Sequence, residues 1–316
     1  MSEFDLIRTH FARLGSDRSD VALGVGDDCA LLRVPPGQDL AVSIDTLVAG
    51  VHFLADCNPE ALGHKALAVG LSDLAAMGAE PAWATLALTL PPELARSADG
   101  SRPDPRGGWL AAFCRGFDNL ARRYSLALVG GDTTRGPLSV SVQVHGVVPQ
   151  GQAVRRRGAA AGDLICVSGS LGDAGLALRQ LLSGAPVSEG PRRRLDWPEP
   201  RVALGMALRG LASAMIDVSD GLAADLGHIL EASCVGAEIR LDRLPRSAAV
   251  AAAGDWTLPL ASGDDYELCF TLPAARRAHL AAVADQGQVE IAVIGEVDRR
   301  PGLRCRLPDG SELQLE

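Results

Sequence analysis

The chain has 316 residues, enough for one large domain or two ordinary ones, and its 47% hydrophobic and 22% charged content is typical of a folded globular protein. The formal net charge of −9, with no basic stripe to offset it, argues against nucleic acid as a partner. Lys65 is the only lysine and lies in LGHKA, which excludes a phosphate-binding loop of the GxxxxGK[ST] type.

The N-terminal segment, MSEFDLIRTHFARLG, is predicted to form a short helix that ends at Gly15, with Phe4, Ile7, Phe11 and Leu14 on one face. It lacks the pattern of a signal peptide, and no uncharged apolar run in the sequence reaches membrane-spanning length. The seven cysteines are scattered without a CxxC pair, as is typical of free thiols in a reducing compartment. We therefore expect a cytoplasmic protein with no membrane partner.

Residues 24–53, GVGDDCALLRVPPGQDLAVSIDTLVAGVHF, contain two predicted strands, 29–34 and 40–44, on either side of a Pro-Pro-Gly turn. An antiparallel hairpin of these strands would bring Asp28, before the first, close to Asp45, after the second. Two carboxylates about 4 Å apart repel by roughly 4 kcal/mol at an effective dielectric constant near 20. Such a cluster therefore needs protons, water or bound cations between its members.

A helix is predicted from Pro59 to Met77, with Asn58 as its N-cap. Asp73 lies within it, in LSDLAAMGA, where an ionised group among alanines and leucines is costly to bury without a partner. The small neighbouring side chains would let a ligand or another backbone come close. An exposed aspartate on a polar stripe is an equally good interpretation of Asp73 alone.

The rest of the first half alternates strands and helices. It is predicted as strand 84–90, a polar loop over 93–108 that is either a lid or a solvated insertion, helix 110–124, a strand that ends in LVGGDTTRG, and strand 138–148. In LVGGDTTRG, two glycines allow a close backbone approach, and Asp132 follows them at the end of the strand.

The alternation restarts near Pro149, which predicts two α/β domains, residues 1–149 and 150–316. Predicted elements of the second domain are strand 163–168, a glycine-rich turn GSLGDAG before a helix from 174, an irregular loop over 184–200, strand 213–218, helix 222–232, helix 274–284, and strands near 290–297 and 303–307. The glycine-rich turn is by itself only a weak phosphate signal. In IDVSDG, Asp217 and Asp220 lie at a strand-to-helix junction, and SGDDYELCF repeats the GDD spelling just before another strand.

Caps and turns explain most single aspartates in such places, so the interpretation depends on the set. The set comprises Asp28, Asp45, Asp73, Asp132, Asp217 and Asp220. No histidine or cysteine is paired with these residues, which disfavours zinc, whereas ligation by oxygen alone suits Mg²⁺ bound with substrate phosphates. Arg156, in AVRRRGA, is a candidate phosphate clamp, with a solvated basic loop as the alternative. Together these residues indicate phosphoryl transfer with several metal ions.

Six motifs, GDDCA, SIDTLVAGVHF, LSDLAAMGA, GGDTTRGPL, IDVSDG and SGDDYELCF, occur in this order, and the chain thereby resembles the thiamine-monophosphate kinase family. This family belongs to the superfamily that includes aminoimidazole ribonucleotide synthetase. The resemblance implies a two-domain α/β (α+β) fold, with an N-terminal metal/ATP-binding and dimerisation domain whose mixed sheet forms a barrel across a homodimer. It implies ATP-dependent phosphorylation of thiamine phosphate to thiamine diphosphate, the last step of thiamine diphosphate biosynthesis, by direct in-line transfer with several Mg²⁺ ions.

The resemblance also implies roles for single residues. Metal-binding positions are Asp28, Ser43, Ile44 (through its carbonyl), Asp45, Asp73, Asp132, Asp217 and Asp220. Nucleotide contacts are Gly131, Asp132, Arg156 and Ser219, substrate contacts are His52 and Asp264, and the catalytic set is Asp73, Asp132 and Arg156.

The chain departs from the family pattern at two of these positions. Ile44 stands where many relatives have threonine, which is harmless if only the carbonyl binds, and Asp264 stands where glutamate is common, which shortens its reach. Two other readings stay open: a sister synthetase activity, and a non-catalytic nucleotide- or metal-binding module. Release of ADP that depends on thiamine phosphate distinguishes both from the kinase.

Overall fold

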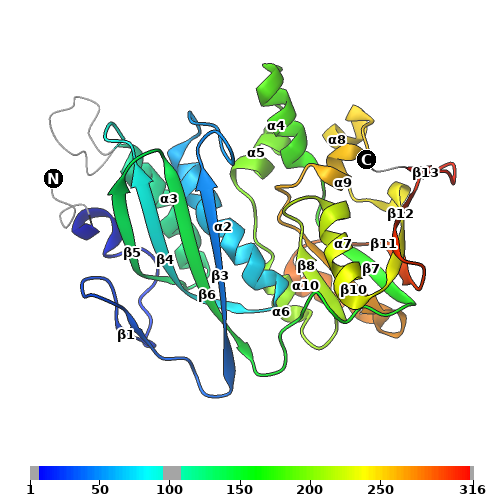
Figure 1. Ribbon diagram of the computed structural model, residues 1–316, viewed down its shortest axis with the longest axis horizontal. Helices are drawn as coiled ribbons and strands as arrows, with labels where there is room; N and C mark the ends of the chain where they lie inside the picture. The colour runs from blue at the N-terminus through cyan, green and yellow to red at the C-terminus, as the bar shows by residue number, and fades with distance from the viewer. Residues whose placement is uncertain (1–6, 95–107, 314–316) are drawn as a thin grey trace. The chain divides into compact units, whose positions relative to one another are not determined.

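A computed structural model describes residues 7–94 and 108–313 of the chain (Figure 1). The chain divides into two compact units, which are described separately. Unit 1 comprises the described residues up to Leu74 together with Glu80–Gln150, and unit 2 comprises Ala75–Ala79 and the described residues from Gly151 onward. Each unit contains a mixed β-sheet and helices, so the predicted α/β architecture is confirmed.

The elements of unit 1 are η1 (Ile7–Phe11), β1 (Val21–Leu23), β2 (Leu31–Leu32), β3 (Gln38–Val48), α2 (Pro59–Ala76, whose last residues cluster with unit 2), β4 (Glu80–Leu90), α3 (Trp109–Arg123), β5 (Ala127–Arg135) and β6 (Ser139–Pro149). Those of unit 2 are β7 (Asp163–Ser168), α4 (Asp173–Ser183), α5 (Glu189–Asp196), α6 (Val202–Ala207), β8 (Ala214–Asp217), α7 (Leu222–Ser233), β9 (Gly236–Arg240), η2 (Leu241–Arg243), α8 (Ala248–Ala253), α9 (Thr257–Ala261), β10 (Leu268–Pro273), η3 (Ala274–His279), α10 (Leu280–Gly287), β11 (Ile291–Asp298), β12 (Gly302–Arg306) and β13 (Glu312–Leu313).

The sheet of unit 1 has the strand order β3-β6-β4-β5, with β4 and β5 parallel and the other pairs antiparallel. Helices α2 and α3 lie on one face of this sheet (Figure 1). Asn58 caps α2 as predicted, accepting a hydrogen bond of 2.9 Å from the backbone N–H of Glu60. Residues 61–72 of α2 are buried on every side, as expected for a helix enclosed by protein rather than lying at the surface.

The other face of the unit 1 sheet is only partly covered. The short β1–β2 pair packs over Trp83 with Val21, Ala30 and Leu32. Beyond it, edge strand β3 presents Leu40, Val42 and Ile44, which are 47%, 52% and 61% exposed. These alternate along the strand with less exposed residues that face α2, so β3 has one apolar face open to the surroundings.

The predicted hairpin of residues 29–34 and 40–44 is wrong. Only Leu31–Leu32 forms a strand in the first segment, and it pairs with β1, whereas β3 pairs with β6 over its full length of 11 residues. A long ladder with a strand from further along the chain satisfies more backbone groups than a local hairpin on a two-residue strand could. Asp28 is therefore not brought to Asp45 by a turn between adjacent strands.

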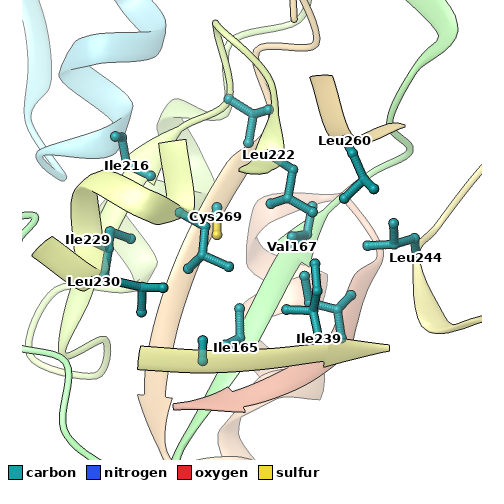
Figure 2. Packing of buried hydrophobic residues seen from close by; sticks show 14 of the residues in the cluster. Ile165, Val167, Ile216, Leu222, Ile229, Leu230, Ile239, Leu244, Leu260 and Cys269 are labelled. Atoms are coloured by element: carbon teal, nitrogen blue, oxygen red, sulfur yellow. The ribbon is translucent and has the colours of Figure 1, made fainter. Parts of the chain in front are cut away.

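The sheet of unit 2 has the order β13-β12-β9-β11-β7-β10-β8, antiparallel throughout except for β12 and β9. Figure 2 shows the main hydrophobic core of unit 2. It contains residues of the strands, such as Ile165 of β7 and Ile239 of β9, and residues of α7, namely Leu222, Ile229 and Leu230. This cluster of aliphatic side chains and two cysteines packs against β8 and β10, and it thereby fixes the end of β8, which carries Asp217.

Several predicted elements need correction. The predicted loop over 184–200 contains helix α5, in which Arg192 and Asp196, one helical turn apart, form an ion pair that the irregular composition did not suggest. The predicted helix 274–284 is a 3₁₀ segment that continues into α10. In the N-terminal segment a single π-helical turn, η1, stands in place of an α-helix, while the first part of that segment and most of the predicted loop 93–108 lie outside the described residues.

The predicted strand 163–168 is confirmed with the same bounds as β7, and the remaining predicted helices and strands recur with shifted ends. Among residues 7–94 and 108–313, no helix combines the length and the apolar character that crossing a bilayer requires.

Candidate active site

Two of the predicted acidic residues lie close together in unit 1. Asp45 projects from β3 toward α2, and Asp73 is on α2, where its carboxylate accepts a short hydrogen bond from the hydroxyl of Ser43. A Cβ atom at Gly70 would lie 3.5 Å from Asp45 Oδ2, so the glycine leaves room for this carboxylate beside the helix. The structure thus brings three predicted metal-site residues, Ser43, Asp45 and Asp73, to one place.

The carboxylate of Asp45 is in an unfavourable environment. Within the described part of the chain its Oδ2 atom is buried and accepts no hydrogen bond. Burial, and secondly the charge of Asp73, raise the pKa of Asp45 from 3.8 to about 6. An orphaned carboxylate oxygen beside a second carboxylate is the arrangement that a hard cation would relieve, so these residues fit Mg²⁺.

A pocket of about 820 Å³ in unit 1 gathers a second part of the predicted set. It is lined by Asp28, which follows β1, and by Gly131 and Asp132 on β5. A Cβ atom at Gly131 would lie 2.0 Å from the carbonyl oxygen of Leu86, so only glycine allows β5 to run this close to β4. The volume falls in the range of small-molecule sites, about 300–1,000 Å³.

The group at Asp45 and Asp73 and the group in the pocket lie at opposite edges of the unit 1 sheet. Asp45 on β3 is paired with Val142 on β6, and Val142 is paired with Leu86 on β4. Leu86 is in turn paired with Gly131 on β5, which precedes Asp132. Three strand spacings, about 14 Å, therefore separate the two edges of the sheet. Within residues 7–94 and 108–313, no three His, Cys, Asp or Glu side chains form a group that could hold a metal ion by themselves.

Two further predicted residues lie on or just after β3. His52 is exposed, and its Nδ1 accepts a hydrogen bond of 3.1 Å from the backbone N–H of Val48, so the neutral ring carries its proton on Nε2. The side chain of Ile44 points away from Asp45 and is exposed. An isoleucine side chain has no ligand atom, so only the carbonyl of Ile44 could bind a cation, and its metal-binding role stays a prediction.

In unit 2, β8 ends at Asp217, which is buried, and a turn of Ser219, Asp220 and Gly221 leads into α7. One oxygen of Asp225, Oδ2, accepts hydrogen bonds of 3.0, 3.1 and 3.1 Å from the backbone N–H groups of these three turn residues. Sequence reasoning missed Asp225. Its spacing of five residues from Asp220, in the first turn of a predicted helix, was the signal that could have found it.

The other two predicted residues of unit 2 adjoin the same turn or the same strand. Asp264 has φ +60°, its Oδ1 accepts a hydrogen bond of 2.9 Å from the hydroxyl of Tyr266, and its N–H donates to Ser219 O at 2.8 Å. Arg156 is exposed, and the carbonyl of its neighbour Arg155 accepts a hydrogen bond of 3.0 Å from Met215 of β8. The structure thus places Arg156 beside β8.

The glycine-rich turn before α4, which the sequence indicated only weakly as a phosphate site, donates a hydrogen bond to a carboxylate of the protein instead. The backbone N–H of Gly172 donates to both carboxylate oxygens of Asp265, at 2.9 and 3.1 Å. Asp265 is buried, and burial raises its pKa well above the usual value. A carboxylate of the protein therefore occupies a donor that a phosphate would need.

Glu267, also missed from the sequence, is buried next to this turn. Its carboxylate accepts hydrogen bonds from Arg194 at 2.5 Å, from Arg201 at 2.5 and 2.7 Å, and from the hydroxyl of Ser168 at 2.6 Å. The arginine-rich part of the predicted loop thus compensates a buried charge.

Comparison with known proteins relates these features to a family. The model of the AIR synthase related protein N-terminal domain matches residues 26–148, and that of the C-terminal domain matches residues 160–308. Thiamine-monophosphate kinase of Escherichia coli (strain K12) is 46% identical over 325 residues, which cover 99% of this chain and 96% of the relative.

Two solved structures are similar along nearly their whole length. Thiamine-monophosphate kinase from Stenotrophomonas maltophilia K279a has a TM-score of 0.85 at 44% identity and covers 98% of this chain and 96% of its own. The structure described as AaThiL complexed with AMPPCP and TMP has a TM-score of 0.76 at 30% identity, with coverages of 92% and 90%. The chain therefore belongs to the thiamine-monophosphate kinase family of AIR synthase related enzymes.

Proposed function

We propose that this chain transfers the γ-phosphoryl group of ATP to thiamine phosphate and so forms thiamine diphosphate and ADP. The family membership and a relative complexed with AMPPCP and TMP support this substrate pair. The observation that carries the proposal in this chain is the pair Asp45 and Asp73, with a buried carboxylate oxygen that accepts no hydrogen bond from the described residues. Such a pair is costly in a protein that does not bind cations.

The transfer is direct and in line, from ATP to an oxygen of the phosphate of thiamine phosphate. The acceptor oxygen forms a bond to the γ-phosphorus as the bond to the bridging oxygen of ADP breaks. No nucleophilic side chain is needed, because the protein contributes positioning and charge stabilisation. Because the sequence has no phosphate-loop lysine, metal ions or arginines must supply the positive charge.

In unit 1, Ser43, the carbonyl of Ile44, Asp45 and Asp73 would hold Mg²⁺, as would Asp28 and Asp132 in the pocket. When bound, Mg²⁺ would neutralise phosphate charge. Groups of only two carboxylates fit Mg²⁺, because this ion usually binds one or two carboxylates together with waters and substrate phosphates. Gly131 offers exposed backbone to the nucleotide, and His52 offers its Nε2–H to the phosphate of the second substrate.

In unit 2, we assign Asp217 and Asp220 to metal binding, Ser219 and Arg156 to the nucleotide, and Asp264 to thiamine phosphate. The support is positional: Asp217 to Asp220 form the end of β8 and the turn after it, and Asp264 is hydrogen-bonded to that turn. Among the catalytic assignments, the positive charge of Arg156 would stabilise the transferred group. In unit 1, Asp73 and Asp132 would act through the Mg²⁺ that they hold.

We also propose a homodimer in the cytoplasm. The apolar face of β3, with Leu40, Val42 and Ile44, lies on an edge strand whose outer backbone groups lack a partner strand among the described residues. A second copy of the sheet would cover this face and edge. The seven cysteines are free, as expected in a reducing compartment.

The direct test measures ADP release by the purified protein with ATP, Mg²⁺ and thiamine phosphate, together with thiamine diphosphate by chromatography. We expect ADP and thiamine diphosphate to form in equal amounts, and no turnover without thiamine phosphate. ADP release that is indifferent to thiamine phosphate, or nucleotide binding without turnover, would refute the proposal in favour of a sister synthetase or a binding module.

A further inference from the structure

The turn of Ser219, Asp220 and Gly221 is held from one side by Asp225. All three turn N–H groups converge on a single buried carboxylate oxygen, at 3.0 to 3.1 Å. An acidic side chain in the first turn of a helix can accept a hydrogen bond from the backbone N–H of the N-cap residue, which here is Gly221. Asp225 reaches further, to the N–H groups of Ser219 and Asp220, which precede the N-cap. Its hydrogen bonds therefore determine the conformation of the turn rather than only the stability of the helix.

The same turn is held from the other side by the segment that carries Asp264. The carbonyl oxygens of Val218 and Ser219 accept hydrogen bonds of 2.8 Å from the N–H groups of Tyr266 and Asp264, respectively. Gly263 has φ +68°, and a Cβ atom there would lie 2.4 Å from Ser219 O, so the two segments are in contact through their backbones. A displacement of the turn would therefore be transmitted to Asp264.

We propose that Asp225 is a positioning residue, whose buried carboxylate orients Ser219 and Asp220 toward nucleotide and metal and, through the main-chain hydrogen bonds, holds Asp264 for thiamine phosphate. This inference rests on the proposed function for the identity of the ligands. We assign Asp225 a role that acts through the turn, because its Oδ2 faces the turn backbone and accepts all three N–H groups. Charge-assisted hydrogen bonds are about twice as strong as neutral ones, so replacing the carboxylate by a neutral amide weakens all three contacts.

The test compares Asp225→Asn and Asp225→Glu with the wild type. The glutamate keeps the charge but displaces it by one methylene group, so it decides the test if the asparagine variant does not fold. We expect both variants to raise the KM for Mg-ATP and the KM for thiamine phosphate by about 10-fold, the lower end of the effect of removing outer-shell partners of metal ligands. Hydrogen exchange of the amides at residues 219–221 should accelerate, and binding of a fluorescent ATP analogue with Mg²⁺ should weaken to the same extent.

Asp163→Asn is the matched control. Asp163 is another buried carboxylate of unit 2 that accepts a backbone N–H, that of Ala160 at 3.0 Å, and a hydroxyl, that of Ser213 at 2.6 Å. Its replacement should lower the midpoint of thermal unfolding yet leave both KM values within about twofold of the wild type, because it removes buried hydrogen bonds elsewhere.

Two failures are distinguishable. If the wild type shows no ADP release that depends on thiamine phosphate, the proposed function fails, while amide exchange and binding of the ATP analogue still decide whether Asp225 positions the turn. If the wild type is active but both Asp225 variants match Asp163→Asn in KM values, analogue binding and exchange at residues 219–221, the positioning role is refuted.

Discussion

Replacing Asp45 by asparagine should make the metal-free protein more stable, although it removes a residue of the candidate site. The pKa of Asp45 is raised from 3.8 to about 6, by burial first and by the charge of Asp73 second. At about 1.4 kcal/mol per pKa unit, ionisation of Asp45 destabilises the folded state by at most about 3 kcal/mol. Because the carboxylate is only partly buried, solvent screening reduces the expected effect to roughly 2 kcal/mol.

The effect has a definite sign and pH window. Below about pH 4 the carboxyl group is protonated in both the folded and the unfolded chain. Between about pH 4 and 6 the folded chain retains a proton that the unfolded chain has released, so the wild type loses stability relative to Asp45→Asn as the pH rises. Above about pH 6 the carboxyl group is ionised in both the folded and the unfolded chain. The difference in free energy of unfolding between the wild type and Asp45→Asn is then constant.

The assay is urea unfolding in the presence of EDTA at several values from about pH 4 to 8, with Asp39→Asn as the control. Asp39 is an exposed carboxylate on the same strand, so Asp39→Asn controls for the loss of one negative charge from β3. Excess Mg²⁺ should stabilise the wild type and remove most of its deficit, but it should stabilise Asp45→Asn much less. The assignment of strain to Asp45 is refuted if the difference in free energy of unfolding between the wild type and Asp45→Asn does not grow with pH. It is also refuted if Asp39→Asn shows the same difference from the wild type.

Three further changes test the site and the assembly. Asp73→Asn should lower kcat by about 100-fold or more because it removes a metal-binding charge, while unfolding stays cooperative; near-normal turnover would remove Asp73 from the catalytic set. His52→Ala should raise the KM for thiamine phosphate about 10-fold and leave the KM for ATP unchanged, because one hydrogen bond to a charged group is lost. An increase in both KM values would contradict a role specific to thiamine phosphate. Ile44→Asp places a charge on the apolar face of β3 and should therefore convert the dimer into monomers, as measured by sedimentation velocity. An unchanged sedimentation coefficient would exclude this face as the interface.

Local features of the fold were predictable because they depend on residues close in the chain. Helix α2 begins where Asn58 and Pro59 predict, and β8 and α7 flank IDVSDG as expected. The order of such motifs was enough to indicate the family, which the comparisons confirm.

Only the tertiary structure decided what depends on distant partners. The amino-acid sequence by itself placed Asp45 just after a strand and Asp73 on a helix. Only the tertiary structure extends β3 through Asp45, by pairing it with β6 about a hundred residues away, and packs this carboxylate beside α2. Asp28 instead lines a pocket with Asp132. Similarly, the orphaned oxygen of Asp45 arises from burial, which no spacing in the sequence records. The physical reason is that strand pairing and desolvation are set by contacts across the whole domain, whereas caps and turns are set by a few neighbouring residues.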